Sequence, residues 1–143
     1  MLLRMTDCGA KGSASVTYLV VDDHAAFRRA LRSHLPGDTV KIVECANGRE
    51  AIGAFEHHHP NWTLMDIEMP GMDGFAATRT IRASFPKARI IILTQHDSPE
   101  LREEARAAGA VAYVLKDRLQ DLPGVISPTL PDAPSNPKPG SSS

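Results

Sequence analysis

The sequence is poor in cysteine and has no excess of charge of either sign. Its two cysteines, Cys8 and Cys45, are not spaced as a CxxC pair, so they predict neither a disulfide framework nor a zinc site. The 16 Lys and Arg residues nearly balance the 17 Asp and Glu residues, giving a net charge of -1. Proteins that bind nucleic acid or acidic membranes usually carry a basic surplus. The cysteine usage fits a reducing cytoplasm, where we expect this protein to lie. The balanced charge predicts that it binds neither nucleic acid nor acidic membranes.

Long apolar runs are also missing. The N-terminus offers only Leu2 and Leu3 before polar residues follow, which is too short for a signal peptide or a membrane span. Residues 1–15 are predicted to form a flexible arm, and the Pro/Ser-rich residues 128–143 a disordered tail. The remaining residues, 16–127, are long enough and apolar enough for one domain with its own core.

Five short apolar segments rich in β-branched residues are predicted to be strands. Most of them lack the polar alternation of a half-exposed strand, so we expect helices to cover them on both faces. The predicted strands are residues 16–22, 39–46, 62–67, 88–95 and 111–116.

Helical patterns lie between these strands. The first, over residues 24–35, places Phe27, Ala30, Leu31 and Leu35 on one face. Three more helices have clear start or stop signals. They cover residues 47–59, which begin with Asn47 as the cap, residues 73–85, which Pro86 stops, and residues 98–109, with Ser98 as the N-cap and Gly109 as the C-terminal cap. A short last helix is predicted, with Asp121 as its N-cap and Pro123 tolerated in its first turn, and Gly124 and Pro128 limit its length. Strands alternating with helices predict a doubly wound α/β domain.

Polar side chains follow the predicted strands at their carboxyl ends. Asp66 ends the third strand within LMDIEMPGMDG, residues 64–74, and Asp22, Asp23, Thr94 and Lys116 follow the first, fourth and fifth strands. In an open parallel sheet, these ends line one edge, where ligands bind. We therefore expect three carboxylates, a hydroxyl and an ammonium to meet in one small region.

Such a group of side chains indicates a particular chemistry. At roughly 5 Å and an effective dielectric constant of about 20, each pair of carboxylates costs about 3 kcal/mol, so a cation is needed. Oxygen ligands without His or Cys favour Mg²⁺. A nearby ammonium and hydroxyl suit a phosphoryl group, and a carboxylate that attacks phosphorus would form an aspartyl phosphate. A flavodoxin-like cofactor domain is the alternative, disfavoured because carboxylates would repel the FMN phosphate.

Each motif alone has a simpler explanation. Asp22 and Asp23 could cap a helix, the MPGMDG segment is ordinary turn chemistry, and Thr94 and Lys116 are common at strand ends. It is their joint occurrence at four strand ends that favours a site. The three histidines in EHHHP, residues 56–60, are consecutive at a helix end and do not converge on one ion.

The segments VVDDH, LMDIEMPGMDG, ILTQHD and AYVLKD, in this order, resemble the receiver (CheY-like) domain of bacterial two-component response regulators, most closely the NarL/FixJ type. The resemblance covers about residues 16–127. It implies a five-stranded parallel sheet in the order 2-1-3-4-5 with helices on both faces.

The resemblance also implies a phosphorylation site. Asp66 would be the phosphoacceptor. Asp23, Asp66 and the backbone carbonyl of Glu68 would hold Mg²⁺, while Asp22 would act mainly through a metal-bound water.

Further residues would read the phosphoryl group. Thr94 and Lys116 would contact its oxygens, and Tyr113 would be the aromatic switch that moves with Thr94. Two positions depart from the common pattern. Gln95 stands where many receivers have a small residue. Asp117 stands where many receivers have a proline, which leaves the local backbone geometry open.

The implied function is that of a single-domain response regulator in a phosphorelay. A histidine kinase or phosphotransfer protein would phosphorylate it, and it would signal through the face of the fourth helix, fifth strand and fifth helix, as a monomer or phosphorylation-dependent dimer. Its only enzymatic chemistry would be its own phosphorylation and dephosphorylation. The alternative is a phosphate sink or shuttle without output. Beyond Lys116 only Arg118 and Lys138 are basic, so direct DNA binding is not expected.

Overall fold

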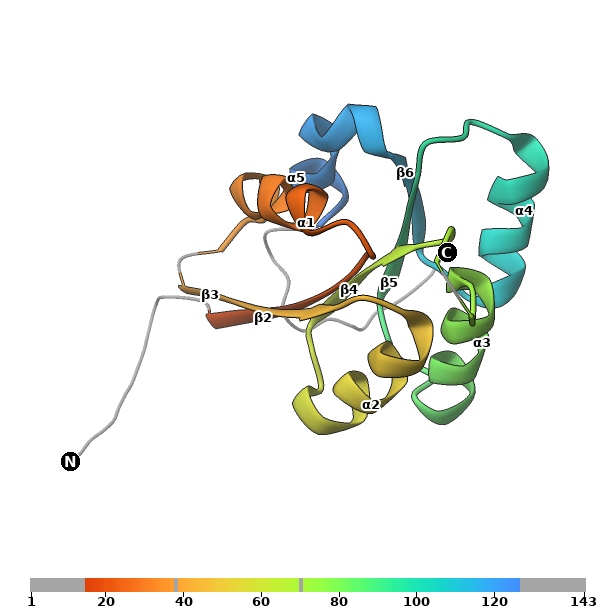
Figure 1. The fold of residues 1–143 in the computed structure, drawn as a ribbon, viewed down its shortest axis with the longest axis horizontal. Coiled ribbons are helices and arrows are strands. Elements are labelled where there is room, and N and C mark those ends of the chain that lie inside the picture. The colour runs from red at the N-terminus through yellow and green to blue at the C-terminus, as the bar shows by residue number, and fades with distance from the viewer. Residues whose placement is uncertain (1–14, 38, 70, 127–143) are drawn as a thin grey trace.

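The structure is a computed structural model that describes residues 15–37, 39–69 and 71–126. Five parallel strands form its one sheet in the order β3-β2-β4-β5-β6, which is the predicted order 2-1-3-4-5 (Figure 1). Each predicted strand is present within two residues of its expected bounds. The strands are β2 (Ser15–Val21), β3 (Thr39–Cys45), β4 (Trp62–Asp66), β5 (Ile90–Thr94) and β6 (Ala112–Leu115). The predicted arm, apart from Ser15, and the predicted tail lie outside the described residues.

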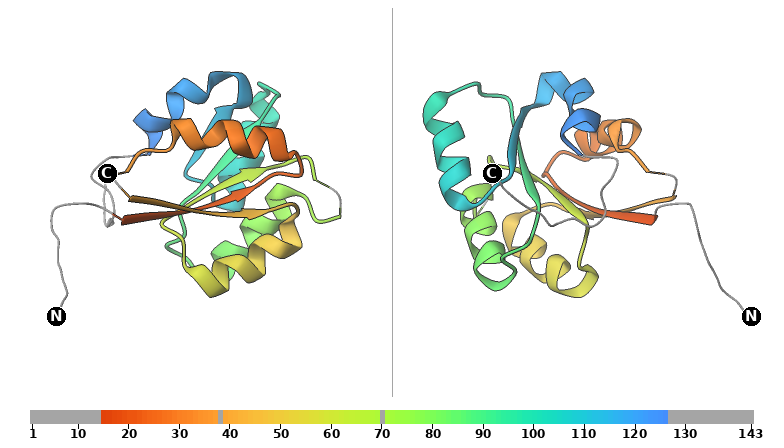
Figure 2. Two further views of the ribbon diagram at one scale, coloured as in Figure 1. Left: turned by 60° about the vertical axis from the view of Figure 1, so that its left-hand side comes forward. Right: turned by 180° about the vertical axis from the view of Figure 1, so that it is seen from behind.

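Helices cover the sheet on both faces, as the sequence predicted. Helices α1 and α5 lie on one face, and α2, α3 and α4 lie on the other (Figure 2). The α-helices are α1 (Ala25–Leu31), α2 (Gly48–His58), α3 (Gly74–Ser84), α4 (Pro99–Ala108) and α5 (Leu122–Val125). Two 3-10 helices, η1 (Arg32–His34) and η2 (Lys116–Asp121), extend α1 and precede α5.

Side-chain caps fix where three of these helices begin. Asn47, Asp73 and Ser98 each accept a hydrogen bond from a backbone amide of the first turn of their helix. Asp121 precedes α5 as predicted, but its side chain makes no capping bond there. Helix α5 is short, as the sequence indicated, with four residues and with Pro123 in its first turn, where a proline is tolerated.

Two apolar layers hold the helices on the sheet. Alternate residues of the central strands point into opposite layers: in β2, Leu19 belongs to the layer under α2 and α3, whereas Tyr18 and Val20 belong to the layer under α1 and α5. Strands β4 and β5 are buried along their whole length. The layers therefore fix the strands whose carboxyl ends carry the polar residues.

Two burial predictions were wrong. Strand β3 was expected to be covered on both faces, yet Lys41 and Glu44 are exposed, because β3 is an outer strand paired only with β2. Ala30 was placed on the apolar face of α1, but it is exposed, while Leu31 and Leu35 are buried. Helix α1 is only seven residues long and turns into η1, so its buried side is narrow.

Candidate phosphorylation site

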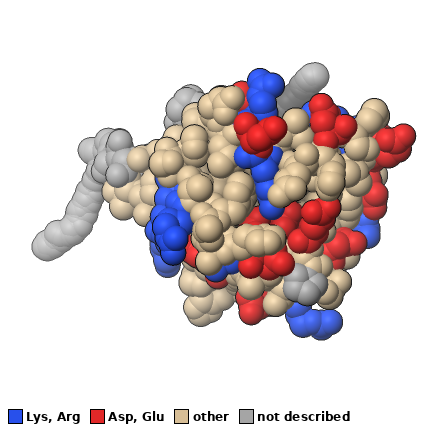
Figure 3. Space-filling view, turned by 45° about the horizontal axis from the view of Figure 1, so that its top comes forward, with Lys and Arg blue, Asp and Glu red and all other residues tan. Residues whose placement is uncertain are grey.

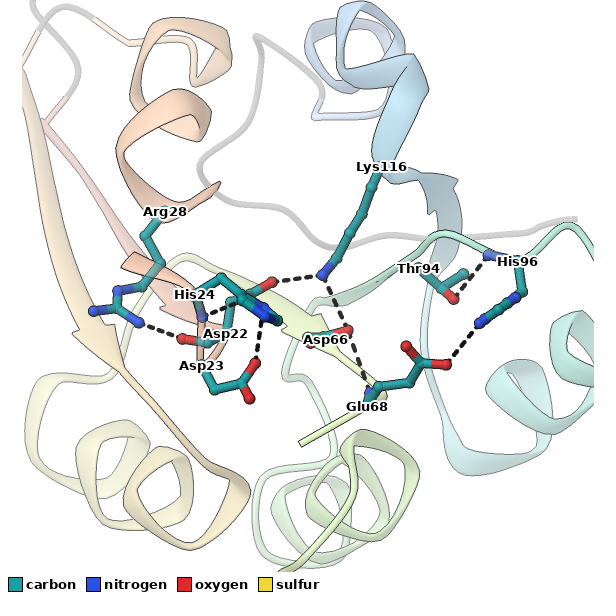
Figure 4. Close-up of polar contacts among 9 residues, drawn as sticks. All are labelled: Asp22, Asp23, His24, Arg28, Asp66, Glu68, Thr94, His96 and Lys116. Carbon is teal, nitrogen blue, oxygen red and sulfur yellow. Dashed lines mark hydrogen bonds and ion pairs between the residues drawn. The ribbon is translucent and has the colours of Figure 1, made fainter. Parts of the chain in front are cut away.

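The predicted polar residues meet at the carboxyl edge of the sheet. The parallel pairing aligns the strand ends, with Asp66 opposite Leu93 and Thr94 opposite Leu115. Asp22, Asp66 and Thr94 are almost fully buried, with 1%, 2% and 1% of their surface exposed. Figure 4 shows Asp22, Asp66 and Lys116 directed toward one another from β2, β4 and the segment after β6. The structure thus brings Asp22, Asp66 and Lys116 together at this edge of the sheet.

Lys116 is the cation at the centre of this site. Its Nζ lies 2.8 Å from Asp22 Oδ2 and 3.3 Å from Asp66 Oδ1. It also lies 4.6 Å from the centre of the Phe27 ring, a cation–π contact from α1. Burial lowers the pKa of Lys116, but the carboxylates of Asp22 and Asp66 more than offset this, and the pKa lies above its usual value. The ammonium therefore balances two buried carboxylates.

Asp66 sits in a tight, dry environment at the end of β4. Its Oδ1 accepts a hydrogen bond of 3.3 Å from the backbone amide of Glu68. Burial raises the pKa of the Asp66 carboxyl, Lys116 opposes this, and the charge of Asp22 adds to it, so the pKa stays above the usual value. A buried carboxylate of perturbed pKa in a cluster of charged groups is a candidate functional group.

The two neighbouring aspartates after β2 have different surroundings. Asp22 is held on several sides: its amide donates to the Cys45 carbonyl at 3.0 Å, and its Oδ1 accepts from the His24 amide at 2.8 Å. Asp23 is far more exposed and has one ion-pair contact, 3.0 Å between its Oδ1 and His24 Nδ1. Asp22 is thus a fixed part of the site, while Asp23 presents its carboxylate at the surface.

The carboxylates of this group are the kind of ligand that a hard cation prefers, whereas the neighbouring His24 nitrogen is not. Asp22, Asp23 and His24 each offer one ligand atom within 4.8 Å of the others. The Asp66 carboxylate lies close to this group in Figure 4 and adds oxygen ligands, which is the ligand chemistry that Mg²⁺ prefers. On the face drawn in Figure 3, most acidic side chains gather in the centre and on the right, and basic ones are scattered around them.

Thr94 and Tyr113 are joined through one loop residue, His96. The His96 amide donates to Thr94 Oγ1 at 3.2 Å, and the Tyr113 hydroxyl donates to the His96 carbonyl at 2.5 Å. The His96 ring lies 2.6 Å from a carboxylate oxygen of Glu68 (Figure 4). The loops after β4 and β5 are therefore connected across the mouth of the site.

Sequence reasoning did not single out three residues that shape this site. Gly74 packs against the Asp66 backbone, His96 connects the two loops, and Arg28 contacts the Asp22 carbonyl. His96 stands two positions after Thr94, and Arg28 lies in the FRR segment of the first helix, but neither position predicts its contacts without the fold. Asp117, whose effect on the backbone was open, lies in η2, where Arg118 departs from helical geometry.

The fold and the site together define a doubly wound domain with an acidic cluster at the carboxyl edge of its sheet. Residues 18–126 match the family model of the response regulator receiver domain. The chain therefore belongs to the response regulator receiver family, the signalling domains of two-component systems, whose phosphorylated aspartate and Mg²⁺-binding acidic pocket are consistent with the site described above. Within the described residues, no helix is long and apolar enough to cross a membrane.

Curated relatives match in sequence. The chain is 40% identical over 101 residues to the transcriptional regulatory protein YhcZ of Bacillus subtilis, covering 69% of this chain and 47% of that protein. It is 39% identical over 99 residues to the transcriptional regulatory protein PdtaR of Mycobacterium tuberculosis, covering 68% and 48%. The chain thus spans about half the length of these curated relatives.

Solved structures match in fold. The signal receiver domain of the response regulator NarL from Mycobacterium tuberculosis has a TM-score of 0.69 and 30% identity, covering 76% of this chain and 92% of that chain. The chemotaxis protein CheY4 of Vibrio cholerae has a TM-score of 0.71 and 27% identity, covering 78% and 96%. These likenesses agree with the NarL-type receiver that the motifs indicated.

Proposed function

We propose that the chain is a response regulator receiver that accepts a phosphoryl group on Asp66 from a histidine kinase or phosphotransfer protein. The observation that carries the proposal is the geometry of Asp66, a buried carboxylate with the Lys116 ammonium 3.3 Å away and Asp22 beside it. Such a site positions a phosphoryl group and neutralises its charge, which is most of what phosphoryl transfer requires of a protein.

Asp66 acts as the nucleophile. Its Oδ1 is engaged by Lys116 and the Glu68 amide, and its other oxygen, which takes part in neither contact, attacks phosphorus. An oxygen–phosphorus bond forms as the bond from phosphorus to the donor's histidine nitrogen breaks, and the histidine leaves. Lys116 and the Thr94 hydroxyl then contact the phosphoryl oxygens. To do so, the Lys116 ammonium must leave its contacts with the carboxylates of Asp22 and Asp66.

Mg²⁺ completes the charge balance in this proposal. Asp23, Asp66 and the Glu68 backbone carbonyl would hold the ion, and Asp22, already paired with Lys116, would act through a bound water. When bound, the ion supplies positive charge to the phosphoryl oxygens. The exposed position of Asp23 supports its role, because its carboxylate is reachable from solvent, whereas that of Asp22 is engaged by Lys116.

The output proceeds through protein contacts. When Thr94 is drawn to the phosphoryl group, its bond to the His96 amide is lost, and His96 also holds Tyr113. Tyr113 can then change position and alter the surface formed by α4, β6 and α5, which would bind the downstream partner as a monomer or in a phosphorylation-dependent dimer. Population shift between two arrangements of this loop is the physical basis.

Phosphorylation is tested with the purified protein, Mg²⁺ and acetyl phosphate. Intact-mass analysis should show one hydroxylamine-labile phosphoryl group in the parent protein and none in Asp66→Asn. Asp73→Asn is the matched control, since Asp73 is an exposed carboxylate whose capping role asparagine can fill. Labelling that persists in Asp66→Asn would show that the acceptor is another residue.

The output is tested by capturing partners with the protein unmodified and in the presence of a beryllofluoride phosphoryl mimic. Different partners in the two states are expected for a regulator that signals through proteins. The same partners in both states would favour a phosphate sink or shuttle. A sequence-specific shift of duplex DNA at physiological salt would contradict the proposed protein-mediated output.

A further inference from the structure

Arg28 links three parts of the chain beside the acidic pocket. From the first helix, α1, its guanidinium donates a hydrogen bond to the backbone carbonyl of Asp22 at the end of β2. Its Nε donates to Glu44 Oε1 on β3 at 2.7 Å, and Arg32 pairs with the other oxygen of Glu44. Only 17% of the Arg28 side chain is exposed. This is a fixed arrangement, unlike an ordinary solvated surface arginine.

The contact lies at a helix start that has no side-chain cap. Helix α1 begins after His24, whose side chain makes no capping bond, and its first turn has no acidic residue. The turn between β2 and α1 is held by the Asp22 side chain, which accepts from the His24 amide at 2.8 Å, and by the Arg28 guanidinium, which donates to the Asp22 carbonyl. The guanidinium therefore ties the start of the helix back to the strand that precedes it.

Holding the Asp22 carbonyl also orients Asp23. The carbonyl of Asp22 and the amide of Asp23 belong to one planar peptide group, so fixing one fixes the direction of the other. The Asp22 amide is already held by Cys45. Because Arg28 also holds the Asp22 carbonyl, the backbone direction at the Cα of Asp23 is fixed. Among the described residues, the printed contact of the Asp23 side chain is the one to His24.

We infer that Arg28 is a positioning residue for the cation site. By holding the Asp22–Asp23 peptide group, it orients Asp23. This inference rests on the proposed function, in which Asp23 is a direct Mg²⁺ ligand. Groups that orient a metal ligand typically contribute about 10- to 100-fold to metal affinity. Arg28 achieves this without opposing the cation strongly, because Glu44 balances its charge.

Charge and positioning predict opposite results for Arg28→Met. If Arg28 acted only as a nearby positive charge, removing it would strengthen Mg²⁺ binding. If it positions Asp23, its removal weakens binding, and we expect an affinity about tenfold lower by isothermal titration calorimetry. Arg28→Lys keeps the charge but cannot reproduce the planar fork, so it is also expected to bind Mg²⁺ more weakly.

Two further measurements separate positioning from general damage. In the metal-free protein, the NMR signal of the Asp23 amide should shift in both Arg28 variants, and saturating Mg²⁺ should restore most of the phosphorylation rate. Arg29 is the exposed neighbour of Arg28 on α1, so Arg29→Met is the control. It should change neither the Mg²⁺ affinity nor the NMR signal of the Asp23 amide. If Arg28→Met does not fold, Arg28→Lys alone decides the question.

The outcomes distinguish this inference from the proposed function. If the parent protein neither binds Mg²⁺ nor becomes phosphorylated, the proposed function is wrong. If it does both, and folded Arg28 variants bind Mg²⁺ as tightly as the parent or more tightly, only the positioning role of Arg28 is overturned.

Discussion

Gly74 packs directly against the backbone of Asp66. A Cβ atom at position 74 would lie 2.2 Å from the Asp66 carbonyl oxygen and 2.9 Å from the Ile67 Cα. Both neighbours are backbone atoms, which cannot move aside as a flexible side chain can. The first residue of α3 must therefore lack a side chain for the helix to reach the end of β4 that carries the phosphoacceptor.

Gly74→Ala should consequently displace the Asp66 loop. We expect the free energy of unfolding to fall by about 1–3 kcal/mol, as for overpacked interiors, and the phosphorylation rate to fall with it. Chemical denaturation and acetyl phosphate labelling measure the two effects. Gly53→Ala in α2 is the control, because a Cβ there meets no atom within 4 Å, and it should stabilise the helix by about 0.5–1 kcal/mol. Equal stability of the two variants would contradict the close contact.

Substitutions of the two aspartates after β2 should have different effects, one mainly on stability and the other mainly on Mg²⁺ binding. Asp22→Asn leaves the mostly buried Lys116 with one carboxylate instead of two, and we expect it to cost about 1.5–3 kcal/mol of stability, the range for a hydrogen bond to a charged group. Asp23→Asn should change stability by less than about 0.5 kcal/mol, since Asp23 is exposed, but should weaken Mg²⁺ binding more than Asp22→Asn does. Thermal unfolding and calorimetric titration test this. The reverse order of Mg²⁺ affinities would show that Asp22 is the direct ligand.

Tyr113→Phe tests the link from the loop after β5 to the proposed output surface. It removes the hydroxyl that donates to the His96 carbonyl, and the loss of one hydrogen bond should cost about 1 kcal/mol. Amide exchange over residues 95–98 should become faster, with the amides of α2 as internal reference, while Asp66 is phosphorylated at the parent rate. Unchanged protection of the loop, together with unchanged partner binding, would rule out this route.

Tyr18 should make stability depend on pH in the alkaline range. Burial raises the pKa of its hydroxyl from 10.0 to about 12, and the hydroxyl donates to the Pro36 carbonyl at 2.5 Å. Between these pH values the unfolded chain has lost the proton that the folded chain keeps, so stability present below pH 10 is lost as pH rises toward 12. The loss is on the order of 3 kcal/mol.

Tyr18→Phe provides the comparison for that prediction. Its free energy of unfolding, measured by denaturant titration at several pH values, should fall less steeply above pH 10. The raised pKa of Lys116 has the same sign, because its ion pairs are lost as the ammonium deprotonates, so part of the alkaline slope should remain. Parallel curves for the two proteins would contradict a buried hydroxyl.

Local signals in the sequence were enough to predict the strands and the residues at their ends, whereas the strand order was implied by the resemblance to receiver domains. The apolar runs, the caps at Asn47 and Ser98 and the turn after Asp66 are local signals, and the parallel order then brings distant residues to one edge. Contacts between elements are different, since they depend on register and on which strand is outermost. That Lys116 pairs with Asp22, and that Arg28 reaches its carbonyl, follows only from the packed structure.

The exposed residues of the outer strand β3 also bear on how the molecule behaves at high concentration. An unpaired strand edge can template the addition of a strand from another chain. On β3, Lys41 and Glu44 are exposed, and the opposite outer strand, β6, has only four residues. Adding a strand at β3 would bury exposed charged side chains, and adding one at β6 would form few hydrogen bonds. The pairing of sheets from two molecules is thus disfavoured at both edges.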